Sequence, residues 1–68
     1  MVEIVVDTYI SEEGSGRAEI KKNDSGYYIM YFDQGGRPFA SETFYENSIH
    51  YVRDAAENWA KGLKTLNG

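Results

Sequence analysis

The amino-acid sequence predicts a small α+β domain, in which a four-stranded antiparallel meander carries one C-terminal helix packed across one face. Two observations predict this fold. Residues 48–66 repeat apolar side chains at alternating spacings of three and four, which places them on one stripe of an α-helix. The residues before them form short segments of β-type composition separated by turn sequences, and such segments need an apolar cover of the kind that this helix supplies.

The chain is 68 residues long, which corresponds to one domain near the lower size limit for unaided folding. It contains no cysteine and one histidine, so we expect no disulfide, no metal site and no cofactor. Aromatic residues make up 15% of the chain, and large rings bury enough surface for a short chain to close a core. We therefore expect stability to come from the core alone, or from a core shared with a second copy.

The net charge of −4 is unevenly distributed. Residues 1–46 hold nine acidic and four basic residues, a net charge of −5, whereas residues 47–68 hold two acidic and three basic residues, a net charge of +1. An acidic chain repels a phosphate backbone, so general nucleic-acid binding is disfavoured. No apolar run approaches the length of a membrane-spanning helix and no signal peptide is recognisable, so a cytoplasmic protein that does not contact a membrane is expected.

The predicted strands are separated by sequences rich in Gly, Asn, Asp and Ser, and they cover residues 2–10, 17–22, 27–33 and 39–45. The first strand carries apolar side chains on one face at a period of two: Val2, Ile4, Val6 and Ile10. The second alternates in the same way, and Ala18 and Ile20 are expected to point inward.

The third strand is apolar on both faces, which indicates a central strand covered on both sides. One face carries Tyr27, Ile29 and Tyr31, and the other carries Tyr28, Met30 and Phe32. The helix can cover only one face, so an aromatic set stays exposed on the other, and such a patch usually marks an interface. The candidates for this interface are Tyr27, Tyr28, Ile29 and Tyr31, and the register decides which set faces the helix.

The predicted helix covers residues 48–66, with Ser48 or Asn47 as its N-cap. Its apolar stripe consists of Ile49, Val52, Ala56, Trp59, Leu63 and Leu66. Trp59, in the middle of the stripe, is interpreted as the anchor of the core. Gly62 interrupts the helical composition, but the stripe stays in phase beyond it, so the helix is expected to continue.

Three groups of residues are considered for chemistry, and each has a simpler structural interpretation. His50 is a possible general base or a surface histidine without a catalytic partner. Asp7 with Glu12 and Glu13 is a possible cation site or a solvated acidic loop. The segment 35–37 (Gly-Gly-Arg) is a possible anion site or a hairpin turn. The structural interpretation is preferred in each case, and no residue is predicted to be catalytic.

The helical segment 54–62, Asp-Ala-Ala-Glu-Asn-Trp-Ala-Lys-Gly, follows a Ser-Ile-His-Tyr helix start. In these motifs the chain resembles small uncharacterised proteins encoded by marine cyanobacterial phages. The resemblance covers mainly residues 27–66 and is strongest in the helix. It implies expression in a bacterial host, where the protein would act on a host or phage protein. It transfers no functional residue, because that group has no assigned activity.

The leading hypothesis is a non-enzymatic interaction protein that forms a homodimer and binds an unknown protein partner. It follows from the aromatic strand, which is apolar on both faces, and from the scattered positions of the ionisable residues. The alternative is a single-stranded nucleic-acid binder that stacks bases on Tyr27, Tyr28 or Tyr31. An enzyme is the third class, with only His50 and scattered carboxylates as candidate catalytic groups.

Overall fold

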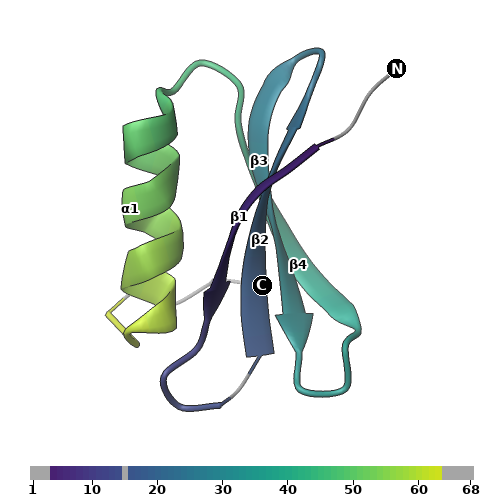
Figure 1. Cartoon of the computed structure of the whole chain (residues 1–68), viewed down its shortest axis with the longest axis vertical. Coiled ribbons are helices and arrows are strands. Elements are labelled where there is room, and N and C mark those ends of the chain that lie inside the picture. Colours follow the sequence, from purple (N-terminus) through teal and green to yellow (C-terminus); the bar gives the residue numbers. More distant parts are fainter. Residues whose placement is uncertain (1–3, 15, 64–68) are drawn as a thin grey trace.

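The structure is a computed structural model that describes residues 4–14 and 16–63. A four-stranded antiparallel sheet, in the order β1-β2-β3-β4, is covered on one face by a single helix (Figure 1). The strands are β1 (Ile4–Ile10), β2 (Gly16–Asn23), β3 (Gly26–Asp33) and β4 (Pro38–Phe44), and the helix is α1 (Ile49–Ala60). The predicted meander with a C-terminal helix is therefore confirmed. The predicted strand start at Val2 lies outside the described residues.

The core lies between α1 and the face of the sheet that the helix covers. The sheet contributes Ala18, Ile20, Ile29, Tyr31 and Phe44, and the helix contributes Val52, Ala55 and Ala56. The inward orientation predicted for Ala18 and Ile20 is confirmed, because both are fully buried. The helix contacts β1, β2 and β3 more extensively than β4. Short alanine side chains on its inner face allow it to lie close to these strands.

A β-bulge at Val6 changes which side chains of β1 face the helix. The extra residue shifts the alternation by one position, so Tyr9 packs against the core together with Val6. Ile10 is 65% exposed and Ile4 is 55% exposed. The prediction that Ile4, Val6 and Ile10 share the inward face is therefore wrong for Ile10, because strict alternation does not hold across a bulge. Ile4 precedes the bulge and lies opposite Lys22, on the helix side of the sheet, but its side chain is not buried.

Capping by Ser48 fixes the start of α1, as the sequence predicts. Its hydroxyl oxygen accepts a hydrogen bond from the backbone N–H of Tyr51 at 3.4 Å, which satisfies one of the unpaired donors of the first turn. Near the other end, the Lys61 ammonium donates to the Glu57 carboxylate at 2.7 Å, across one helical turn. This pair is exposed to solvent, so its contribution to stability is small.

The helix ends at Ala60, and the prediction that it continues through Gly62 is wrong. Gly62 has a φ of +80°, in the left-handed region. The N–H groups of Gly62 and Leu63 donate to carbonyl oxygens of the last turn at 3.0 and 2.8 Å, which is the hydrogen-bond pattern of a Schellman cap. Leu63 is 75% exposed, and Leu66, the last residue of the predicted stripe, lies outside the described residues.

This cap predicts that Gly62→Ala destabilises the protein by about 1–2 kcal/mol, because an L side chain at positive φ brings its Cβ against the backbone. Denaturant unfolding of the variant and the unaltered chain measures the difference. Gly62→Asn is the matched control, and it should cost less, because asparagine tolerates this conformation better than alanine. A more stable Gly62→Ala variant would show instead that the helix continues in solution.

Candidate functional site

The structure decides which aromatic set of β3 faces the helix. Ile29 and Tyr31 are fully buried beneath α1, and Tyr27 packs against the same core. Successive side chains of a strand alternate between the two faces of the sheet. Tyr28, Met30 and Phe32 therefore point to the face opposite the helix. No element among residues 4–14 and 16–63 covers that face (Figure 1).

Two of the predicted interface candidates are therefore corrected. Ile29 and Tyr31 are 0% exposed, so they form the core and cannot contact a partner in this fold. Tyr27 is half-buried on the helix side, where the Lys22 ammonium lies 5.5 Å from its ring centroid. Of the candidates, Tyr28 alone lies on the uncovered face. A strand period of two places Met30 and Phe32 on the same face as Tyr28. This period could have identified both as interface candidates from the sequence.

Side chains of β2 complete the uncovered surface. Arg17, Glu19 and Lys21 lie opposite Phe32, Met30 and Tyr28, respectively, in the register of β2 and β3. Directly opposed residues point to the same face of an antiparallel pair. We define the outer face as these residues of the two central strands: Arg17, Glu19, Lys21, Tyr28, Met30 and Phe32.

Charged side chains shield part of the apolar surface of the outer face. The Arg17 Nε donates to Glu19 Oε2 at 3.0 Å, and Lys21 Nζ lies 3.8 Å from Glu19 Oε1. The Arg17 guanidinium carbon lies 4.2 Å from the ring centroid of Phe32, close enough for a cation–π contact. The Arg17 guanidinium and the Lys21 ammonium, whose nitrogen lies 5.9 Å from the same centroid, therefore lie over the Phe32 ring and cover part of it.

Several exposed apolar side chains lie away from the outer face, at a strand end, in β4, on the helix and after it: Ile4, Phe39, Tyr51 and Leu63. Tyr45 is exposed in the turn that follows β4. Phe39 is the extra residue of a second bulge, in β4, and its ring centroid lies 6.3 Å from that of Tyr31. The two edge strands of the sheet thus each carry a bulge. Bulges disrupt the regular ladder that a second chain would need to pair with an edge.

The opposite face of the sheet holds a buried phenol–carboxylate pair. The Tyr31 hydroxyl donates to the Glu42 carboxylate at 2.7 Å, and the Tyr31 ring packs against Trp59 with a centroid separation of 5.0 Å. Burial of the phenol is the main cause that raises the pKa of Tyr31 above its ordinary value, and the hydrogen bond to Glu42 adds to it. The pair fixes β4 to β3 and stays within the core.

The ionisable residues considered for chemistry lie at different ends of the molecule. His50 is exposed in the first turn of α1. The backbone N–H of Glu12 donates to the carbonyl oxygen of Ala60, at the other end of the helix, about 15 Å away at the usual rise per residue. Asp7 pairs instead with Arg53 at 3.6 Å. Among the described residues, no group of three or more His, Asp or Glu side chains could hold a metal ion.

The glycine turn between β3 and β4 binds an internal anion. The Asp33 carboxylate accepts hydrogen bonds from the backbone N–H groups of Gly35 and Arg37 at 2.9 and 3.0 Å. Gly36, between them, has a φ of +84°, which glycine adopts without strain. These N–H groups are thus used within the protein, and the segment 35–37 is a hairpin turn, in agreement with the preferred interpretation.

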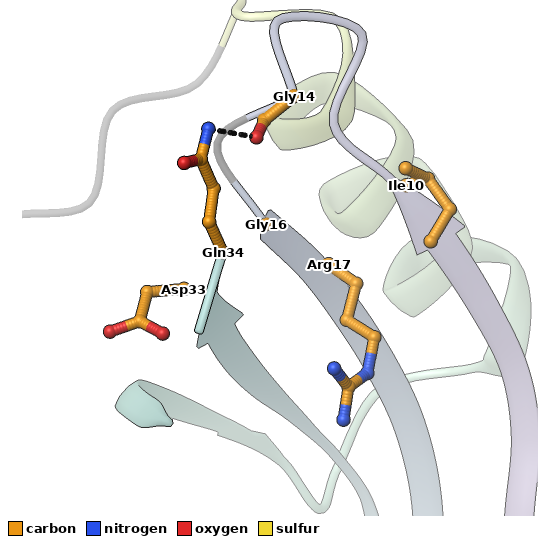
Figure 2. A pocket seen from close by; sticks show the side chains of 6 residues that line it. All are labelled: Ile10, Gly14, Gly16, Arg17, Asp33 and Gln34. Atoms are coloured by element: carbon orange, nitrogen blue, oxygen red, sulfur yellow. Dashed lines mark hydrogen bonds between the residues drawn. The ribbon is translucent and has the colours of Figure 1, made fainter. Parts of the chain in front are cut away.

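A shallow depression of about 240 Å³ borders the outer face at the start of β2 (Figure 2). Its lining consists of Ile10, Gly14, Gly16, Arg17, Asp33 and Gln34. The side-chain amide of Gln34 donates to the carbonyl oxygen of Gly14 across its rim, as Figure 2 shows. Both charged side chains of the lining already bind protein groups, so the depression is best described as the margin of the outer face.

Comparison of the chain with protein-family models, with curated proteins and with solved structures gives no significant match. Within the part of the chain that the structure describes, no helix is both long and apolar enough to cross a membrane. The geometry and composition of the outer face therefore carry the functional argument.

The raised pKa of Tyr31 predicts how stability changes at alkaline pH. Below about pH 10 the phenol is protonated in both the folded and the unfolded chain, so its contribution is fully present. Above that pH the unfolded chain loses this proton while the folded chain keeps it, so the free energy of unfolding falls as pH rises. Above about pH 10, the free energy of unfolding of the unaltered chain should therefore fall by about 1.4 kcal/mol per pH unit more than that of Tyr31→Phe. Denaturant unfolding across this range measures both curves, and parallel curves would contradict the buried phenol.

Proposed function

We propose that this chain is a non-enzymatic interaction protein that binds a protein partner through the outer face. The observation that carries the proposal is the asymmetry of the sheet. One face is sealed by α1, whereas the other presents Tyr28, Met30 and Phe32 beside Arg17 with no described element over them. Tyr, Phe, Met and Arg are residue types enriched in the cores of protein interfaces.

The charge pattern of the outer face supports a protein partner. Glu19 lies between Arg17 and Lys21 and pairs with both, so the surface has a net charge of only +1. When a partner covers these three side chains of β2, each cation already has a carboxylate beside it. This pairing lowers the free-energy cost of removing water from the charges. The surface is therefore suited to an apolar contact with a polar rim.

The shape of the sheet also favours its face over its edges as a contact surface. Bulges interrupt both edge strands, at Val6 in β1 and at Phe39 in β4. In addition, β4 begins with Pro38, which has no N–H to donate to a neighbouring strand. Addition of a partner strand to either edge is thus hindered, whereas the outer face is regular across the two central strands.

Site-specific photo-cross-linking tests this proposal. A benzoylphenylalanine in place of Tyr28 should cross-link to a protein partner in a bacterial lysate, because this position belongs to the outer face and lies beside Met30. The same group in place of Tyr51, an exposed tyrosine on the helix that covers the opposite face, is the matched control. The additional substitution Met30→Glu should abolish the adducts from position 28. Equal adducts from both positions, or adducts that survive Met30→Glu, would contradict the proposal.

The cation–aromatic pair of Arg17 and Phe32 also favours a second candidate function, the binding of single-stranded nucleic acid by base stacking. The acidic net charge of the whole chain opposes it. Fluorescence anisotropy with labelled single-stranded oligonucleotides decides between the two. We expect no binding at physiological salt. Binding that weakens steeply with added salt and is lost in both Arg17→Ala and Phe32→Ala, but not in Tyr51→Ala, would favour nucleic acid instead.

A further inference from the structure

We propose that the partner of the outer face is a second copy of this chain, packed sheet against sheet around a two-fold axis that runs parallel to the strands. The inference rests on the proposed function, because it names the occupant of the same surface. It is argued from the area of the face, from the register of its residues and from the symmetry that their charges allow.

The area of the sheet agrees with a dimer interface. Its strands are seven or eight residues long. At about 3.3 Å per residue and 4.8 Å between strands, four strands make a face of about 25 by 19 Å, or roughly 480 Å² in projection. Protruding side chains make the accessible area larger than the projection. The projection alone is therefore more than half of the roughly 800 Å² per partner that a specific interface buries.

The register places the outer face in rows that cross the sheet. Thr8 of β1 lies opposite Glu19, Glu19 lies opposite Met30, and Met30 lies opposite Ser41 of β4. A two-fold axis parallel to the strands, midway between β2 and β3, keeps each row at its own height and exchanges its ends. Each protomer then places the charged residues of β2 over the apolar residues of the partner's β3.

This arrangement brings cations to aromatic rings across the interface. Arg17 lies at the height of Phe32, and Lys21 at the height of Tyr28, so each meets the corresponding ring of the partner. Such contacts become more favourable once water is excluded from them. Glu19 contacts both cations within its own protomer, so neither cation is buried without a carboxylate beside it.

An axis perpendicular to the strands gives a poorer fit. It places β2 over the partner's β2 in the opposite direction, which sets Arg17 against the partner's Lys21 and Glu19 against the partner's Glu19. Like charges that meet across an interface are penalised. The charge order of β2 therefore selects the axis that runs along the strands.

Sedimentation equilibrium of the purified full chain tests the dimer. The mass should rise from 7.7 kDa toward twice that value as the concentration increases. Met30→Glu should stay monomeric with an unchanged far-UV circular dichroism spectrum, because residue 30 lies at the centre of the outer face. Tyr51→Glu, a matched change at an exposed site on the helix, should still dimerise. Added salt should strengthen the dimer, since both protomers carry the same net charge.

The absence of cysteine from the chain allows cross-linking to test the axis. Thr8 and Ser41 are exposed and lie at opposite ends of one row. In the proposed dimer, a mixture of Thr8→Cys and Ser41→Cys chains should form the mixed disulfide, and neither variant alone should form its own. Efficient self-cross-linking of either variant alone would overturn the proposed axis.

The dimer and the proposed function can fail separately. A monomer at every concentration, with Tyr28-dependent adducts to a different protein in the lysate, overturns the dimer and leaves the outer face as a site for that partner. A monomer without such adducts overturns both. A mass that increases equally in Met30→Glu and in the unaltered chain overturns the assignment of the dimer to the outer face.

Discussion

The burial of Tyr31 is the interaction on which the rest of the structure depends. Its side chain is the largest that is fully buried, and its ring contacts Trp59 on the helix while its hydroxyl donates to Glu42 on β4. One residue of β3 thus connects three elements. Its hydrogen bond also satisfies a polar atom that would otherwise cost about 1–3 kcal/mol if it were buried without a partner. With Tyr31 in the core, strand alternation turns its neighbours outward.

The outer face follows from this constraint. A central strand with aromatic residues on both sides cannot hide them all beneath a single helix. The chain limits the exposure of the second set by placing Arg17 and Lys21 on the adjacent strand, where their charged groups lie over the Phe32 ring. The resulting surface is partly apolar and partly charged, so it can remain in contact with water or be covered by another protein. The proposed dimer would cover it with a second copy of the same surface.

The edges of the sheet are shaped differently from its face. The bulges at Val6 and Phe39 interrupt the edge strands and turn apolar side chains out of their expected phase. They also disfavour the open-ended strand pairing that leads to aggregation. Since a face-to-face contact closes on itself around a two-fold axis, it buries apolar surface without creating a growing assembly.

Local spacing and turn chemistry were enough to predict the order of elements, the meander, a helix start capped by Ser48 or Asn47, and the apolar character of both faces of β3. Three features were decided by tertiary structure. The packing of α1 places Tyr31, and not Tyr28, in the core. An isolated strand does not decide between them, because the side chains on either face of β3 are apolar. The bulge in β1 turned Ile10 outward, because only pairing with β2 reveals an extra residue. The helix ends at Ala60, because a left-handed cap at Gly62 satisfies the last carbonyl groups of α1. Leu63 is then no longer part of the apolar stripe.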